Sequence, residues 1–434
     1  MSDAEAPRKE ALFARALDGL TKMGASSASA VRFWVPGRIE FLGKHTDYAG
    51  GRSLLCAIER GFCVAAAARS DGRLRVCDAR SGDVIEGEVH PATAGRSGHW
   101  SAYPLTVAHR VGANFSMPLV GADMTFASDL PIASGISSSS ALVVATYLVL
   151  ANVNGLAARE EFRRVITSEA ELAEYLGAVE NGLTYRSLAG ERGVGTFGGS
   201  EDHTAILCGQ PQALVQYSFC PVRFERAIPL PGDHAFVIAS SGVMAEKAGA
   251  ALESYNRLAT LARAALDRWR RATGRGDATL GDALRFAGGT EPVVDMVRSS
   301  TVATDSFSAE ALAERVRQFA TESEQLIPSA SDALSRNALD ELGAVVDRSM
   351  RNAVTMLHNQ IDETIFLTAH ARELGAVAAS AFGAGFGGSV WALVSRVESA
   401  QLAEQLLADY RQRFPGHADA EVFVTPAGPA ATAV

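Results

Sequence analysis

The sequence predicts a mixed α and β fold with more than one domain, and three observations lead to this prediction. At 434 residues the chain is longer than a single hydrophobic core usually supports, since domains average roughly 150 residues. Hydrophobic residues make up 47% of the chain and charged residues 21%, which is typical of globular proteins and excludes wholesale disorder. Segments with helical periodicity and strand-like runs both occur along the whole chain.

The first half opens with a predicted helix over residues 6–23, where Leu12, Ala16 and Leu20 recur at helical spacing. Strand-like runs follow, separated by Gly, Asp and Arg turns. An apolar helix and a second helix rich in Glu, Arg and Ala come next. The predicted strands are 31–35, 58–68, 73–78, 124–128 and 213–217, and the two helices are 137–153 and 160–175.

A turn at residues 229–232 separates two strands and is the predicted domain boundary, which gives domains 1–230 and 231–434. The second half is expected to be mainly helical, with a few strands, and to end in a frayed tail of small residues, 426–434. Its predicted helices are 245–272, 308–320, 329–356 and 360–374, with a last helix between the strands 390–394 and 421–425; the first strand of this half is 235–240.

The charge balance limits the partners of the chain. Its 40 basic and 49 acidic residues give a net charge of −9, so neither nucleic acid nor a membrane surface is an expected partner. The longest apolar stretch, residues 141–151, is about half of what a membrane span needs. Residues 1–20 lack the pattern of a signal peptide, so a cytoplasmic location is expected. The five cysteines show no zinc-site spacing.

Residues 36–51 form the first of three glycine-rich segments. It carries five hydrogen-bonding side chains close together, which suits recognition of a small polyhydroxylated ligand. The alternative is a solvated turn with a salt bridge. A Walker A motif is excluded, because the glycine spacing is wrong and a histidine stands in place of Ser or Thr. The five side chains are Arg38, Lys44, His45, Asp47 and Tyr48.

The second segment, residues 130–142, is a Gly/Ser loop that leads directly into the apolar helix. A helix N-terminus presents free N–H groups and a partial positive charge, and hydroxyl groups add donors, so this loop is predicted to bind phosphate. The alternative is an N-cap with more serines than a cap needs. The candidate residues are Gly135, Ser137, Ser138, Ser139 and Ser140.

The third segment, residues 381–390, contains G-x-G-x-x-G but precedes a strand near the C-terminus, which excludes a Rossmann site. It is either a structural hairpin or a loop against a ligand. Between the second and third segments, Gly198 and Gly199 precede Asp202, which is either a positioned reactive carboxylate or a helix N-terminal carboxylate.

Together and in this order, the three segments resemble the motifs of the GHMP kinase superfamily. The first resembles the galactokinase signature P-G-R-x-x-x-x-G-E-H-T-D-Y-x-G-G, the second G-L-S-S-S-A and the third G-x-G-F-G-G. The resemblance implies an α+β fold in which an N-terminal mixed-sheet domain and a C-terminal ferredoxin-like domain enclose the active site. It also implies transfer of the ATP γ-phosphate to the anomeric hydroxyl of galactose or a close relative, with Mg²⁺ bound at the phosphates.

The resemblance assigns roles to individual residues. Asp202 matches the family's catalytic aspartate and Arg38 its partner arginine. Glu180 matches the acidic Mg²⁺ ligand, and Ser139 falls where the superfamily uses a serine near the metal. The remaining matches are the sugar-contacting positions His45, Asp47 and Tyr255 and the ATP-binding positions Gly135, Ser137, Ser138, Ser139 and Ser140.

One defined position of the signature departs: Lys44 replaces a glutamate that contacts the sugar's 6-hydroxyl in the family. An ammonium group only donates hydrogen bonds, so a substrate altered at C6 is expected. Galacturonate, a pentose such as arabinose, and galactose held by Lys44 all stay open, as does a structural ion pair of Lys44 with Glu40 or Asp47. The unusual sequence around Asp202 leaves a heptose kinase open, and a catalytically weak sugar sensor is the alternative outside the enzymes.

Overall fold

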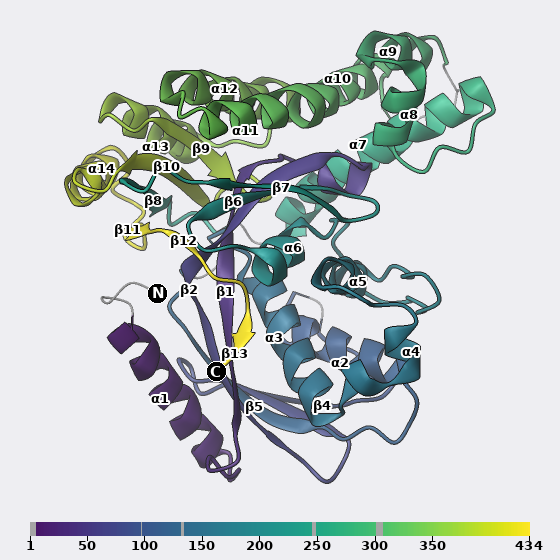
Figure 1. The fold of residues 1–434 in the computed structure, drawn as a ribbon, viewed down its shortest axis with the longest axis vertical. Coiled ribbons are helices and arrows are strands. Elements are labelled where there is room, and N and C mark those ends of the chain that lie inside the picture. Colours follow the sequence, from purple (N-terminus) through teal and green to yellow (C-terminus); the bar gives the residue numbers. More distant parts are fainter. Residues whose placement is uncertain (1–5, 97, 132–133, 245–248, 301–306) are drawn as a thin grey trace.

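The computed structural model describes residues 6–96, 98–131, 134–244, 249–300 and 307–434. In these residues the chain forms two β-sheets covered by helices, with a further group of helices at one end (Figure 1). The predicted α+β class is confirmed. The main path of the first sheet has the strand order β13-β1-β2-β5-β3-β4, and the second sheet has the order β11-β8-β10-β9.

The first sheet is built around two long strands, β1 and β2, which pair antiparallel. β3 and β5 pair in parallel, and the other pairs in this sheet are antiparallel. Its strands are β1 (Val31–Leu42), β2 (Arg52–Ala68), β3 (Arg73–Asp78), β4 (Val84–Glu88), β5 (Ala122–Ser128), β6 (Ala213–Ser218), β7 (Arg223–Pro229), β12 (Ala427–Gly428) and β13 (Thr432–Ala433).

Both faces of this sheet are covered, which explains why β2 reads as a nearly continuous apolar run. Cys63 and Ala65 face the helix α1 (Ala6–Lys22), whereas Phe62 and Val64 face the main core on the opposite side. Small side chains under α1 let the helix pack closely on the sheet. The opposite face carries α2 (Ala102–Asn114), α3 (Ser138–Val153), α5 (Glu169–Asn181) and α6 (Glu201–Cys208) (Figure 1).

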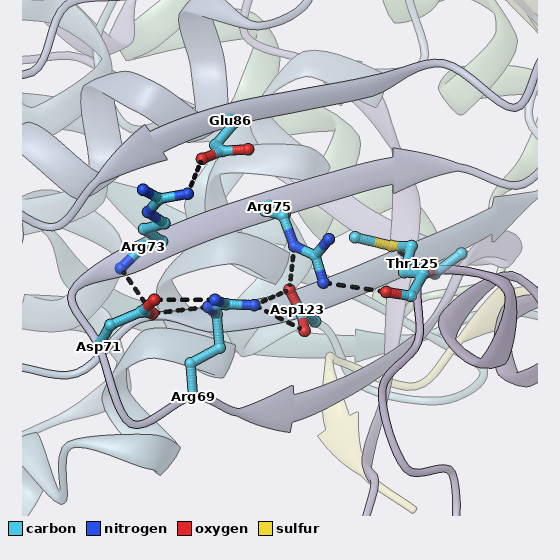
Figure 2. Close-up of polar contacts among 8 residues, drawn as sticks. Arg69, Asp71, Arg73, Arg75, Glu86, Asp123 and Thr125 are labelled. Atoms are coloured by element: carbon cyan, nitrogen blue, oxygen red, sulfur yellow. Dashed lines mark hydrogen bonds and ion pairs between the residues drawn. The ribbon is translucent and has the colours of Figure 1, made fainter.

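A charge network around the buried Asp123 ties three strands of this sheet together. Asp123 on β5 accepts hydrogen bonds from Arg75 on β3 at 2.6 Å and from Arg69, just after β2, at 3.1 Å (Figure 2). Arg69 also pairs with Asp71, and Arg75 donates to the backbone carbonyl of Met23 after α1. The network fixes the parallel β3–β5 pair and the end of α1 relative to β2.

The second sheet is antiparallel throughout and packs against helices through the apolar faces of its strands. The chain enters it between Pro229 and His234, at the predicted turn. Its strands are β8 (His234–Ser240), β9 (Ala378–Phe382), β10 (Ser389–Ser395) and β11 (Glu421–Thr425), and its helices are α12 (Leu339–Asn352), α13 (Asp362–Glu373) and α14 (Ser399–Arg413).

A separate group of helices has its own apolar core, which includes Leu266, Val293 and Phe319. Its helices are α7 (Gly249–Thr273), α8 (Leu280–Ala287), α9 (Thr290–Ser299) and α10 (Ala309–Ala320). A π-helical turn, η3 (Thr321–Leu326), continues α10 and leads into α11 (Ile327–Ser335). The remaining short turns are η1 (Asp47–Ala49), η2 (Leu156–Ala158), α4 (Glu160–Arg163) and η4 (Ala353–Leu357).

Two sequence predictions are wrong in detail. The helix predicted over 160–175 is interrupted, because Ser168 is extended and caps a new helix by accepting a hydrogen bond from the Glu171 N–H. The tail is not frayed, since β12 pairs with β2 and β13 pairs with β1. Residues 245–248 of the predicted helix 245–272 lie outside the described residues.

The division into domains 1–230 and 231–434 stays a prediction, and the return of β12 and β13 to the first sheet crosses it. Among the helices that the structure describes, none combines the length and the hydropathy that a membrane crossing requires.

Candidate functional site

A cavity of about 520 Å³ is lined by all three glycine-rich segments. Its walls come from β1, the loop after β1, the N-termini of α3 and α6, the end of α5, and the turn between β9 and β10. Tyr255 of α7 also lines it. The predicted site residues that line the cavity are Arg38, His45, Asp47, Gly135, Ser137, Ser138, Ser139, Ser140, Glu180, Asp202 and Tyr255.

The centre of the cavity is an ion pair between β1 and α6. Arg38 Nε lies 2.7 Å from Asp202 Oδ1, and Arg38 Nη1 donates to the carbonyl of Gly135 at 2.7 Å. Burial lowers the pKa of Arg38, but the carboxylates of Asp202, Glu201 and Glu40 outweigh this effect and raise it. Arg38 therefore stays charged, and it fixes both Asp202 and the serine loop.

The serine loop ends in a helix N-terminus that opens into the cavity. Ser137 adopts a left-handed conformation, with φ of 58°, directly before α3 begins at Ser138. The buried Ser137 hydroxyl has no hydrogen-bond partner among the described residues. A buried hydroxyl without a partner, next to free N–H groups at the start of a helix, fits an anionic phosphate group.

The predicted metal-binding carboxylate contacts Ser140 rather than Ser139. Ser140 Oγ lies 2.9 Å from Glu180 Oε2 and 3.2 Å from Asp202 Oδ2. His203 Nε2 is also 3.0 Å from Glu180 Oε2. A carboxylate and a hydroxyl are hard oxygen donors, which suit Mg²⁺ when phosphate oxygens complete its coordination. In the described part of the chain, no group of three or more His, Cys, Asp or Glu residues is arranged to hold a metal by itself.

The signature loop after β1 is held from α10 and from the β9–β10 turn. Arg315, almost fully buried, donates to the carbonyl of His45 and to the Tyr48 hydroxyl. His45 Nε2 lies 3.2 Å from the carbonyl of Ala384, so this nitrogen carries the proton and Nδ1 accepts from Tyr48 at 3.0 Å. Burial lowers the pKa of His45 to about 3, so its ring stays neutral near pH 7.

Asp47 is positioned by backbone N–H groups. Its Oδ1 accepts from Tyr48 and its Oδ2 from Glu201, at 2.8 and 3.1 Å. A side chain at Gly199 is excluded, because a Cβ there would lie 2.2 Å from Asp47 Oδ2. The Tyr255 ring lies 5.6 Å from the His45 ring. Asp47, His45 and Tyr255 thus lie around the same end of the cavity.

Lys44 is the predicted site residue that the structure does not bring to the cavity wall. Its side chain is buried, with 1% exposure, and its Nζ donates to Ser380 Oγ at 2.8 Å and to Ser349 Oγ at 3.4 Å. Ser349 Oγ donates in turn to Glu322 on η3. The alternative that was left open, a structural ion pair of Lys44 with Glu40 or Asp47, does not form either. The predicted sugar contact of Lys44 finds no support in this geometry, because the second sheet and α12 supply acceptors for its ammonium away from the cavity.

Two carboxylates of the cavity, Glu40 and Glu201, are absent from the predicted site. Side chains alternate along a strand, so Glu40 lies on the same side of β1 as Arg38, and this spacing was the available signal. Glu201 lies beside Asp202 and accepts from Ser53 Oγ at 2.6 Å. Burial raises the pKa of Glu201 well above its usual range, and the nearby carboxylates add to this effect.

Another part of the cavity wall is aromatic. Phe126 lies edge-on to both Phe62 and Trp100, with ring centroids 5.1 and 5.9 Å apart, and Tyr103 lines the same region. Flat apolar surfaces of this kind suit a planar heterocycle. This wall has no signal in the sequence, because its residues come from β2, β5 and the start of α2, which share no motif.

Glu40→Gln is expected to stabilise the ligand-free protein more at pH 8 than at pH 5. Burial raises the pKa of Glu40 from 4.5 to about 7, and Glu322 adds to this, whereas Lys44 and Arg38 lower it. The native state therefore binds this proton more tightly than the unfolded state, so the contribution of Glu40 is present below pH 4.5 and is lost as the pH rises through 7. Glutamine does not ionise.

The difference in unfolding free energy between the variant and the wild type is expected to grow by about 3 kcal/mol between pH 5 and pH 8. Urea denaturation of the ligand-free proteins at both pH values measures it. A difference that does not change with pH would contradict the raised pKa.

Comparison with known proteins identifies the family. Residues 22–68 match the galactokinase galactose-binding signature, and residues 102–184 match the N-terminal domain of GHMP kinases. The chain is 28% identical over 372 residues to the galactokinase of Roseiflexus sp. (strain RS-1), which covers 83% of this chain and 82% of the relative. It is 25% identical over 398 residues to the galactokinase of Mannheimia succiniciproducens, with 89% and 91% covered.

Solved structures agree with the fold. The galactokinase of Lactococcus lactis in complex with galactose superposes with a TM-score of 0.77 and 22% identity, covering 96% of this chain and 98% of that chain. The mevalonate kinase of Methanococcus jannaschii gives a TM-score of 0.55 with 14% identity, over 93% of this chain and 100% of that chain. The chain belongs to the galactokinase family of the GHMP kinase superfamily and is an ATP-dependent, galactokinase-like sugar kinase.

Proposed function

We propose that this protein phosphorylates the anomeric hydroxyl of galactose or a closely related sugar. The observation that carries the proposal is the Arg38–Asp202 ion pair, which lies in one cavity with the N-terminus of α3 and with the signature loop. Phosphoryl transfer needs little covalent chemistry from the protein and depends on positioning and on stabilising charge. This pair can supply both.

Asp202 is the proposed base. Arg38 holds its Oδ1, and Oδ2 lies 3.2 Å from Ser140 Oγ, so the carboxylate is fixed in one orientation. In this orientation Asp202 accepts the proton of the anomeric hydroxyl as that oxygen attacks phosphorus. The Arg38 guanidinium favours the ionised carboxylate and stabilises negative charge on the transferred group.

The two ends of the cavity would bind the two substrates. Asp47, His45 and Tyr255 would contact the sugar hydroxyls, and Asp47 would act as a hydrogen-bond acceptor. The aromatic wall near Trp100 and Phe126 would hold the adenine ring of ATP. The phosphates would lie at the N-terminus of α3, on the N–H groups and hydroxyls of Ser137, Ser138, Ser139 and Ser140 and beside Gly135.

Mg²⁺ is proposed to bind at Glu180 together with a serine of the same loop. Ser140 has the geometry for this role, since its hydroxyl already contacts the Glu180 carboxylate, whereas the motif points to Ser139. When bound, the ion would neutralise phosphate charge. Ser139→Ala and Ser140→Ala separate the two assignments. Only the substitution that removes the metal-binding serine should raise the Mg²⁺ concentration needed for half-maximal rate.

The function is tested by ATP consumption with Mg²⁺ against galactose, galacturonate, arabinose, N-acetylgalactosamine, glucose and a heptose, with NMR assignment of the phosphorylated carbon. Galactose phosphorylated at C1 is the expected result. A higher rate with another sugar would make that sugar, and not galactose, the substrate. Sugar binding without ATP consumption across the panel would contradict the kinase and favour a sensor.

A further inference from the structure

Glu40 presents a carboxylate oxygen that the protein itself does not use. Its Oε2 accepts from the Gly383 N–H at 3.1 Å, in the turn between β9 and β10. Its Oε1 is buried and has no hydrogen-bond partner among the described residues. Glu40 is only 3% exposed, yet it lines the cavity. Because buried polar atoms are almost always paired, this oxygen is a candidate ligand contact.

The charges around Glu40 do not satisfy this oxygen. Arg38 directs its Nε to Asp202 and its Nη1 to the Gly135 carbonyl. Lys44 directs its Nζ to Ser380 and Ser349, and within the described part of the chain no ion pair joins it to Glu40. Burial raises the pKa of Glu40, both cations lower it, and Glu322, on η3, raises it further. The neighbouring cations therefore affect the pKa of the Glu40 carboxylate without donating a hydrogen bond to Oε1.

Glu40 also lies at the sugar end of the cavity. It accepts from Gly383, and His45 donates to Ala384, the next residue of the same turn. The resemblance to galactokinases assigns a sugar-contacting carboxylate to position 44, but Lys44 is directed away from the cavity. Glu40, a carboxylate four residues earlier, lies on the wall of the same cavity.

We propose that Glu40 recognises the 6-hydroxyl of the sugar and that the substrate is a neutral hexose that carries this hydroxyl. The inference rests on the proposed function, since it concerns the sugar of that reaction. Oε1 accepts the hydrogen bond of the hydroxyl, which gives this buried oxygen its partner. The role moves from position 44 of the family signature to position 40.

The same arrangement disfavours a uronate. A carboxylate at C6 would lie beside Glu40 in a cavity that also contains Asp47, Glu201 and Asp202. Arg38 and Arg80 are the cationic side chains among the residues that line it; Arg38 is already bound to Asp202, and Arg80, which follows β3, donates to the Ser128 carbonyl at 3.4 Å. Like charges in a buried site repel strongly, so galacturonate is expected to be a poor substrate.

The test compares D-galactose with 6-deoxy-D-galactose, which lacks only the 6-hydroxyl, in the wild type, Glu40→Gln and Glu40→Ala. The wild type is expected to prefer galactose by about 10- to 100-fold in kcat/KM. In Glu40→Ala the preference is expected to fall below about 3-fold, mainly through KM for galactose, whereas Glu40→Gln, which keeps an acceptor oxygen, lies between. Glu86→Ala, at an exposed glutamate on β4, is the control and should keep the wild-type ratio.

The ratio of the kcat/KM values for two sugars, measured on one enzyme preparation, does not depend on the folded fraction. A variant that folds poorly therefore still gives a valid ratio. Galactose phosphorylation with an unchanged ratio in Glu40→Ala would overturn the role of Glu40 and leave the kinase intact. A preference of the wild type for galacturonate over galactose would also overturn the recognition of the 6-hydroxyl by Glu40. Failure of the wild type to phosphorylate any sugar would instead overturn the proposed function.

Discussion

Asp202→Asn is expected to lower kcat by about 10²- to 10⁴-fold, while ATP and galactose still bind. The amide has the shape of the carboxylate and can still accept a hydrogen bond from Arg38, which Asp202 contacts at 2.7 Å. It does not accept the proton of the attacking hydroxyl. The loss should therefore appear in the chemical step, measured by coupled ATP consumption, with dissociation constants from isothermal titration calorimetry.

Asp71→Asn is the matched control, because Asp71 belongs to the charge network of the first sheet and does not line the cavity (Figure 2). It is expected to keep kcat. If Asp202→Asn turned over at the wild-type rate, Asp202 would not be the base. If it lost both ligands as well as turnover, the role of the carboxylate would be to hold the cavity together.

Lys44→Glu, which restores the residue of the galactokinase signature, is expected to destabilise the protein by about 3–5 kcal/mol. The new carboxylate would be buried where an ammonium group now donates to Ser380 and Ser349, close to Glu322 and Glu40. Buried like charges without a cation are strongly unfavourable. Urea denaturation at pH 7 measures the loss.

Lys44→Met keeps the length of the side chain and removes its charge, so it is expected to cost less than Lys44→Glu. Glu322 keeps the Gly43 N–H and the Ser349 hydroxyl as donors in that variant. A Lys44→Glu protein as stable as the wild type, with faster turnover of galactose, would contradict the structural role and return position 44 to the sugar site.

The sequence predicted those parts of the site that are encoded in contiguous motifs. The serines before α3 and the pair formed by Arg38 and Asp202 belong to segments whose local chemistry is already informative. The aromatic wall was missed because Phe62, Trp100 and Phe126 meet only after β2, α2 and β5 have packed. A local sequence pattern carries no information about contacts between residues that are far apart in the chain.

Lys44 shows that a motif can also predict a contact that distant parts of the chain prevent. Its neighbours in sequence are ligand-facing residues, so its position in the motif predicts a ligand contact. Its direction is decided by Ser349 and Ser380, which lie more than 300 residues later in the chain. The turn at residues 229–232 was readable from local turn chemistry. The return of residues 427–433 to the first sheet was not, because nothing in those residues marks their partner strands.

The pairing of β13 with β1 also affects how the protein is made. Phe33 pairs with Ala433, 400 positions later, so the edge of β1 has no partner while the ribosome synthesises everything between them. Unpaired strand edges are the usual starting points of aggregation, and contacts between distant residues form slowly. β1 also carries Arg38 and Glu40. Newly made chains that lack β13 are therefore expected to depend on chaperones, and a truncation before residue 427 should lower the soluble yield before it affects catalysis.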